Sequence, residues 1–136
     1  MTAPFIFKND ILKGKRALIT GGGSGIGLAI ANRLAMAGAD VALASRRIEL
    51  CQEEAGKIAK AHGVKALGLG VNVRDPDSVK QSFIDATRGF GADHLDILVN
   101  NAAGNFYYPS HMLSENQWKA VLEIDLYGTF HCSREA

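Results

Sequence analysis

The feature that most constrains the fold is a glycine-rich turn, TGGGSGIG, at residues 20–27. The turn follows a short apolar run, residues 16–20, and precedes a segment whose apolar residues recur at helical spacing. This arrangement is typical of nucleotide-binding sites, because the free N–H groups and the positive dipole end of the helix face the phosphates. A flexible turn without a ligand is the alternative, but the strand before the turn and the helix after it favour nucleotide binding.

Individual positions in the turn have separate expected roles. Gly21 lets the chain turn sharply out of the strand, Gly25 lets the backbone approach a pyrophosphate, and Gly27 lets the helix pack tightly on the sheet. The cofactor-binding residues that we expect in this turn are Thr20, Gly21, Gly23, Ser24, Gly25, Ile26 and Gly27.

Strand-like and helix-like segments alternate along the chain. We expect strands at residues 16–20, 41–45, 66–71 and 96–99, and helices at about residues 26–37, at 48–62, from 75 onward and from 114 to the end. The alternation predicts an α/β fold, a Rossmann-type doubly wound parallel sheet of about four strands with flanking helices. The last helix is still in full periodicity at Ala136, and the fourth strand would have a bare outer edge. We therefore expect residues 1–136 to be the N-terminal part of one longer domain whose C-terminal half is absent.

The composition argues against several classes of function. The 15 basic and 14 acidic residues give a net charge of +1, which argues against a protein held on nucleic acid by bulk charge. No apolar stretch is long enough to span a bilayer, so no membrane association is expected. The two cysteines offer no disulfide framework, and the four histidines share no ligand spacing, so we expect no metal site. Without an N-terminal targeting segment the cytoplasm is the default location, and a peroxisomal address at an absent C-terminus is the alternative.

Two motifs together indicate a family. The turn has the spacing G-x-x-x-G-x-G, and residues 100–104, Asn-Asn-Ala-Ala-Gly, follow the fourth expected strand. The chain resembles the short-chain dehydrogenase/reductase family, whose signatures are T-G-x-x-x-G-[IL]-G and N-N-A-G. The resemblance covers essentially the whole chain, but only the N-terminal half of the family's domain. It implies that the second motif contacts a nicotinamide cofactor through Asn101, Ala102, Ala103 and Gly104.

The residues after the second and third expected strands favour NADP(H) over NAD(H). An acid at the end of the second strand would bind the adenine ribose hydroxyls and repel a 2′-phosphate. Ser45 holds that position here and is followed by Arg46 and Arg47, which can bind phosphate through charge-assisted hydrogen bonds, with the serine hydroxyl adding another. Two solvated surface arginines are the alternative. After the third strand the family usually has Asp-Val beside the adenine. Asn72 and Val73 stand there, and the asparagine carbonyl can still accept from the adenine amino group.

The tyrosine and lysine that perform catalysis in this family have no counterpart in the chain. None of the three tyrosines is followed four residues later by lysine, so we expect this chain by itself to be inactive. Asp125 lies where the family often has asparagine, in the pattern N-x-x-G. On a helical wheel it falls on a mostly apolar face with Trp118 and Val121, where an unpaired acid is costly. Asp125 is either an active-site acid that organises a water or the substrate carbonyl, or a structural acid that is hydrated or caps a neighbouring loop.

Asp125 and the segment Asn105-Phe106 resemble the 2,4-dienoyl-CoA reductase branch of the family. That resemblance implies an acyl-CoA substrate and NADPH-dependent reduction of a 2,4-dienoyl-CoA to a 3-enoyl-CoA. The rival hypotheses are a 3-oxoacyl-thioester or other carbonyl reductase of the same family, and a non-catalytic NADP(H)-binding module. The family usually pairs subunits through helices around its fourth and fifth strands, so a homo-oligomer is expected for the full-length protein.

Overall fold

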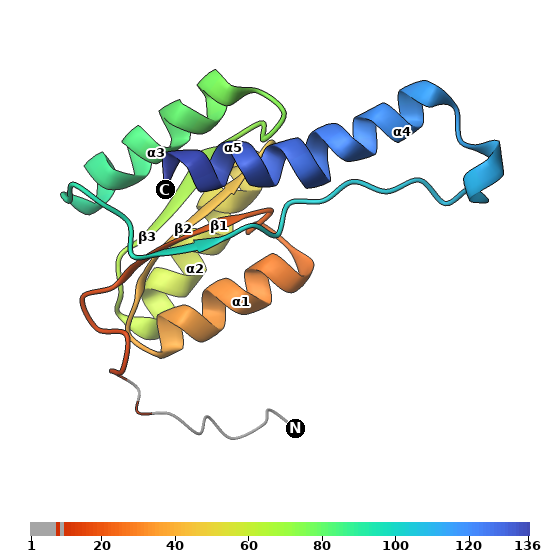
Figure 1. Cartoon of the computed structure of the whole chain (residues 1–136). Helices are drawn as coiled ribbons and strands as arrows, with labels where there is room; N and C mark the ends of the chain where they lie inside the picture. Colours follow the sequence, from red (N-terminus) through yellow and green to blue (C-terminus); the bar gives the residue numbers. More distant parts are fainter. Residues whose placement is uncertain (1–7, 9) are drawn as a thin grey trace, which may run out of the picture.

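A computed structural model describes residue 8 and residues 10–136, and its centre is a four-stranded parallel sheet (Figure 1). The strands are β1 (Arg16–Thr20), β2 (Asp40–Ser45), β3 (Ala66–Gly70) and β4 (Ile97–Val99). Their order in the sheet is β3-β2-β1-β4, and each neighbouring pair is parallel. In this register the carboxyl ends of the four strands lie along one edge, which is where parallel sheets of this kind bind ligands.

Helices cover both faces of the sheet. On one face, α1 (Gly25–Met36) and α2 (Ile48–His62) bury small side chains such as Ala31 and Ala55 against Ile19 and Leu43. On the other face, α3 (Pro76–Phe90) and the C-terminal helix α5 (Gly128–Glu135) pack on residues such as Leu18. The prediction of a doubly wound, Rossmann-type α/β fold is therefore confirmed, with both apolar sheet faces buried in separate clusters.

The buried face of α1 is formed by small residues. The apolar residues that recur at helical spacing in this segment are Ile26, Ile30, Leu34 and Ala37, whereas the fully buried positions of α1 are Gly27, Ala31 and Ala35, with Ala37 buried just after the helix. Ile26 is 74% exposed. The small residues let the helix lie close to the sheet, whereas Ile30 and Leu34 only flank the contact as half-buried side chains.

Capping interactions confirm the predicted end of α2 and the predicted start of α3. Gly63 ends α2 with a φ of +69°, and the Asp75 side chain accepts a hydrogen bond from the backbone N–H of Asp77 at the start of α3. Two predicted strand residues lie outside their strands, since β3 ends at Gly70, before Val71, and β4 begins after Asp96.

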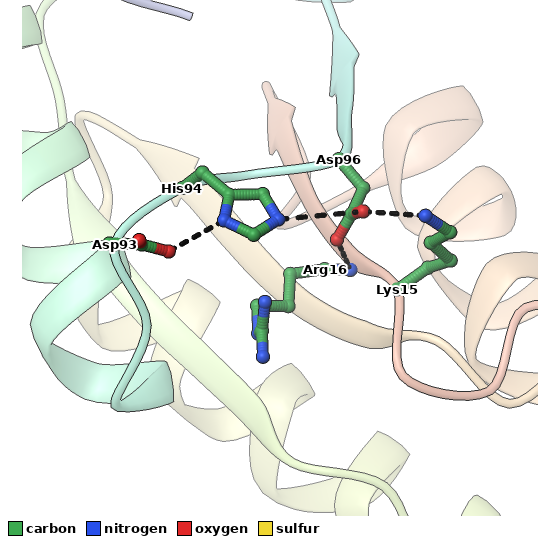
Figure 2. A network of polar contacts seen from close by, with 5 residues as sticks. All are labelled: Lys15, Arg16, Asp93, His94 and Asp96. Carbon is green, nitrogen blue, oxygen red and sulfur yellow. Dashed lines mark hydrogen bonds and ion pairs between the residues drawn. The ribbon is translucent and has the colours of Figure 1, made fainter.

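The Asp96 carboxylate belongs to a polar network at the edge of the sheet opposite the carboxyl ends of the strands (Figure 2). It accepts hydrogen bonds from Lys15 Nζ at 2.8 Å and from the backbone N–H of Arg16 at 2.9 Å. His94 lies between Asp93 and Asp96, with ring-nitrogen to carboxylate distances of 2.6 and 3.8 Å. These contacts hold the residues before β1 against the residues before β4 and lower the pKa of Asp96, chiefly through the Lys15 hydrogen bond.

The last helical region is not the single regular helix that was predicted. It consists of α4 (Glu115–Leu122), a π-helical segment η2 (Glu123–Tyr127) and α5, preceded by a short 3₁₀ helix, η1 (Ser110–Met112). A capping box begins α4, with Ser114 and Gln117 bonded to each other's backbone N–H groups. A π segment changes the helical phase, and the hydroxyl of Thr129 in α5 donates to the carbonyl of Asp125 in η2 at 2.7 Å. Among the helices of the described residues, none is long and apolar enough to cross a membrane.

Candidate cofactor groove

The carboxyl edge of the sheet carries a groove of about 580 Å³, formed where the loops after all four strands converge. It lies over the point where the strand order reverses between β1 and β4, the usual ligand position in open α/β sheets. The predicted cofactor residues that line it are Gly21, Ser24, Ile26, Ser45, Arg46, Arg47, Asn72, Val73, Asn101, Ala102 and Ala103. The structure thus brings together segments from four different loops of the chain.

The glycine turn is packed on its inner side and open on its outer side. Gly21 has a φ of +66°, and a Cβ there would lie 2.8 Å from the Asn101 side-chain nitrogen. A Cβ on Gly27 would lie 2.4 Å from the Gly21 carbonyl oxygen, so only glycine allows this close approach of helix and turn. Gly25 has a φ of +55° and no protein atom near its would-be Cβ, which leaves space for a ligand over the start of α1.

Thr20 lies beneath the groove and joins its two central walls. The residue is 1% exposed, and its hydroxyl donates to the Val99 carbonyl and accepts from the backbone N–H groups of Asn101 and Ala102, each at 3.0 Å. The Asn101 amide group donates in return to the Thr20 carbonyl at 3.0 Å. These bonds fix the loop after β4 against the end of β1, so Thr20 supports the site from below instead of lining it.

The corner at the end of β2 carries Ser45, Arg46 and Arg47, whose side chains differ in their hydrogen-bond partners. The Ser45 hydroxyl accepts from the backbone N–H of Arg47 at 3.1 Å and lies 3.1 Å from the buried thiol of Cys51. Its hydrogen-bonding groups therefore serve the loop itself. Arg47 Nη2 donates to the Ser24 hydroxyl at 3.1 Å, whereas the exposed Arg46 guanidinium has no hydrogen bond or ion pair among the described residues. The two guanidinium groups make this corner suitable for a phosphate.

The loop after β3 contributes residues that the sequence analysis missed. Arg74 lines the groove and forms an ion pair with Glu123, and Val71 and Ile124 complete the lining. Arg74 follows Asn72 and Val73 directly, so its position in sequence was the available signal. The Asn72 side-chain oxygen already accepts from the Arg74 backbone N–H at 3.3 Å, which leaves one of its lone pairs free.

A second cavity of about 420 Å³ adjoins this loop. Its lining residues are Asn72, Arg74, Asp75, Glu123, Tyr127 and His131. The ring Nδ1–H of His131 donates to the Val73 carbonyl at 3.0 Å, because a carbonyl can only accept. This bond holds α5 against the loop that borders the main groove.

Asp125 occupies a solvent-exposed position in η2, so the expectation that it shares a buried apolar face is wrong. Trp118, which the wheel placed beside it, is 56% exposed. One Asp125 oxygen accepts from the backbone N–H of Gly104 at 2.8 Å. The carboxylate thus holds the end of the loop whose Ala102 and Ala103 line the groove.

Several expected site residues lie behind or beside the groove rather than in its lining. Gly23 is buried, and a Cβ there would lie 3.0 Å from the Cys51 sulfur. Gly104 is packed so that a Cβ would lie 2.6 Å from Ile124. The full set outside the lining is Thr20, Gly23, Gly25, Gly27, Gly104 and Asp125. Among the described residues no cluster of three or more histidine, cysteine or acidic side chains could hold a metal ion.

Comparison with known proteins agrees with this geometry. The model of the short chain dehydrogenase family matches residues 15–136. The chain belongs to the short chain dehydrogenase family. Its relatives include the peroxisomal 2,4-dienoyl-CoA reductase of Danio rerio, 42% identical over 129 residues that cover 95% of this chain and 42% of that protein. The Rattus norvegicus peroxisomal 2,4-dienoyl-CoA reductase is 43% identical, over 95% of this chain and 44% of that protein.

Solved structures of the family have the same fold. A candidate short-chain alcohol dehydrogenase from Sinorhizobium meliloti 1021 superposes with a TM-score of 0.86 at 39% identity, covering 95% of this chain and 50% of that chain. An alcohol dehydrogenase from Thermococcus sibiricus, solved in complex with 5-hydroxy-NADP, gives a TM-score of 0.83 at 29% identity over 89% of this chain and 51% of that one. The chain therefore spans about half the length, or less, of the relatives and structures that it matches.

Proposed function

We propose that residues 1–136 are the NADP(H)-binding part of a short-chain dehydrogenase/reductase domain that reduces 2,4-dienoyl-CoA thioesters. The observation that carries the proposal is the combination of an open glycine turn with two arginines and no acid at the end of β2. The names of the Danio rerio and Rattus norvegicus relatives support the substrate class. The 5-hydroxy-NADP in the Thermococcus sibiricus structure supports the cofactor class.

The residues in and around the groove fit a dinucleotide cofactor that carries a 2′-phosphate. Gly25 leaves space at the first turn of α1, where backbone N–H groups can bind a pyrophosphate. Arg46 and Arg47 can bind a 2′-phosphate through paired N–H donors, and the remaining lone pair of Asn72 can accept from the adenine amino group. When bound, NADPH supplies a hydride. The loop of Asn101, Ala102 and Ala103 forms the wall opposite the arginine corner and is held there by Thr20.

In the proposed reaction a 2,4-dienoyl-CoA takes up the hydride of NADPH and then a proton from water, which gives a 3-enoyl-CoA and NADP⁺. The thioester oxygen carries the enolate charge that develops between the two steps, and a hydrogen-bond donor must face it. Asp125 contributes by holding Gly104 and thereby the loop that borders the site. Because the chain contains no Tyr-x-x-x-Lys, we propose that it binds cofactor without turnover on its own. The complete protein is proposed to be a homo-oligomer. Its compartment stays a prediction, cytoplasmic by default, with the peroxisomal names of the relatives favouring the alternative.

Titration calorimetry of this chain with NADPH and NADH tests the cofactor assignment. The expected result is NADPH binding at least about tenfold tighter than NADH binding, a difference of about 1.4 kcal/mol. Equal affinities, or tighter binding of NADH, would contradict it. The full-length protein then separates the substrate classes: NADPH oxidation with a dienoyl-CoA supports the reductase, oxidation with a 3-oxoacyl thioester supports the carbonyl reductase, and binding without turnover of either supports a non-catalytic module.

A further inference from the structure

The loop after β3 is held by three different elements, one at each of its residues that line the groove beyond Val71. The Asn72 backbone N–H donates to a serine hydroxyl of α3 at 2.9 Å, and the Arg74 side chain forms an ion pair with Glu123 of η2. Between them, the Val73 carbonyl accepts from the ring Nδ1–H of His131 in α5 at 3.0 Å. The position of this wall of the groove therefore depends on the helices that pack against it.

The Val73 carbonyl depends on its partner more than the neighbouring residues depend on theirs. Val73 is 7% exposed, whereas Asn72 and Arg74 are exposed to solvent. Among the residues that the structure describes, His131 is the only donor to this carbonyl. An exposed group that loses its partner can bond to water, but a carbonyl of a buried residue is left unsatisfied. Loss of the His131 donor is therefore the change that would displace this loop.

Helix α5 also packs directly on the side chain of the same valine. Gly128 lies three residues before His131, so the two residues share one face of the helix. A Cβ on Gly128 would lie 2.8 Å from Val73 Cγ2 and 3.0 Å from Val73 Cβ. The buried positions of α5 are Gly128 and Cys132, on the side that faces the sheet. The helix therefore contacts Val73 through both its side chain and its carbonyl.

We propose that His131 is a positioning residue for the adenine end of the cofactor, because it fixes Val73 and with it the neighbouring Asn72 side chain. The inference rests on the proposed function, in which the free lone pair of Asn72 accepts from the adenine amino group. A loop that is already held loses less conformational freedom when a ligand binds. NADP(H) and NAD(H) both carry the adenine, so His131 contributes equally to the affinity for each.

Replacement of the imidazole by a ring without a donor tests the proposal. In His131→Phe, the dissociation constants for NADPH, NADH and 5′-AMP should each rise about three- to tenfold, as measured by titration calorimetry. The three nucleotides share the adenine and differ in the 2′-phosphate and the nicotinamide, so an equal loss assigns the effect to the adenine end. Hydrogen exchange at the Arg74 amide, which donates to the Asn72 side chain, should accelerate in the same variant.

Two amide variants separate the position of the donor from the loss of the imidazole. Asparagine carries its side-chain nitrogen at the same bond distance from the backbone as histidine Nδ1, whereas glutamine carries it one bond farther away. His131→Asn should therefore restore all three affinities to within about twofold of the unmodified chain, and His131→Gln should resemble His131→Phe. Affinities that follow the thermal unfolding midpoint in all variants, without rescue by asparagine, would show a merely structural role and overturn the inference.

His62→Phe is the matched control. His62 is a half-buried histidine of α2 that contacts Asn32 of α1, on the face of the sheet opposite α5. This variant should leave all three affinities unchanged. Unchanged affinities in His131→Phe, or a loss confined to NADPH, would overturn the inference and leave the proposed function standing. If the unmodified chain binds none of the three nucleotides, the proposed function fails first and the inference fails with it.

Discussion

Asp125 shows how a single side chain can shape a site without lining it. Its carboxylate accepts from the Gly104 backbone N–H at 2.8 Å, and its own carbonyl accepts from the Thr129 hydroxyl at 2.7 Å. Gly104 packs against η2, since a Cβ at this position would lie 2.6 Å from the end of the Ile124 side chain. The loop and η2 are therefore closely packed, and the carboxylate supplies the acceptor that the loop needs.

Substitution of Asp125 separates a positioning role from a proton-transfer role. Asp125→Asn keeps an oxygen that can accept from Gly104, so the pH profile of kcat in the full-length enzyme should superimpose on that of the unmodified enzyme. Asp125→Ala removes the acceptor and should lower kcat by about tenfold, the effect of losing one charge-assisted hydrogen bond of roughly 1.5 kcal/mol. Hydrogen exchange at the Gly104 amide should accelerate in the alanine variant only. A loss of 10²–10⁴-fold in Asp125→Asn, with a shifted pH profile, would instead show that Asp125 transfers a proton.

At the scale of elements, the glycine turn combines positions that pack with positions that stay open. Gly21 and Gly27 are constrained by Asn101 and by each other, whereas Gly25 is constrained only by its φ of +55°. A side chain at Gly25 therefore meets no protein atom, but it enters the space above the start of α1. The proposed pyrophosphate would occupy the same space.

Gly25→Ala should abolish binding of both NADPH and NADH while the fold is kept. The variant carries a strain of about 1–2 kcal/mol, because an alanine disfavours positive φ. Gly63→Ala is the matched control, since Gly63 has a φ of +69° and equally open surroundings at the end of α2, away from the groove. Chemical denaturation should give similar losses of stability for the two variants, and calorimetry should show lost binding only for Gly25→Ala. Retained binding in Gly25→Ala would place the phosphates elsewhere.

Helices and strands could be predicted where residues close in the sequence determine them. Periodicity and capping chemistry predict the strand–turn–helix unit at residues 16–36, the end of α2 before Gly63, and the starts of α3 and α4 after Asp75 and Ser114. The structure confirms these elements. The apolar spacing located α1 but did not identify its fully buried positions, because contact with the sheet selects the small side chains of Ala31 and Ala35.

The missed parts of the site depend on contacts between distant residues. The bond from Arg47 to Ser24 spans 23 positions, and the bond from Gly104 to Asp125 spans 21. The π segment that presents Asp125 has no signature in apolar periodicity. The pattern of residues could therefore indicate which loops meet at the groove, but not which side chains are engaged with one another there.

On the scale of the whole molecule, the two edges of the sheet have different roles. The carboxyl edge carries the groove, and the opposite edge is held by the network of Lys15, Arg16, His94 and Asp96 (Figure 2). The network joins the starts of β1 and β4, whose carboxyl ends form the central walls of the groove. The stability of the β1–β4 strand pair is thus linked to a group that titrates.

The pKa of Asp96 lies below its ordinary value of 3.8, because its charged form is favoured by the Lys15 hydrogen bond and the Arg16 N–H. A carboxyl whose pKa is lowered in the folded state contributes stability above its unfolded pKa and loses it as the pH falls toward the folded pKa. Urea unfolding should therefore give Asp96→Asn a lower free energy of unfolding than the unmodified chain at pH 6–7. This difference in free energy should shrink below about pH 4. A difference in free energy of unfolding that is unchanged at pH 3 would show that the charge of Asp96 contributes nothing to stability.

The central claim is that this groove selects NADP(H) through the arginine corner after β2, and Arg46→Asp tests it most directly. The change replaces a free guanidinium with a charge that repels a 2′-phosphate and that can accept from the ribose hydroxyls of NADH. Titration calorimetry should show NADPH affinity falling by roughly 100-fold and NADH affinity changing by less than about threefold. Arg88→Asp makes the same charge reversal at an exposed site on α3 and should alter neither affinity. Equal losses for the two cofactors in Arg46→Asp would contradict the account.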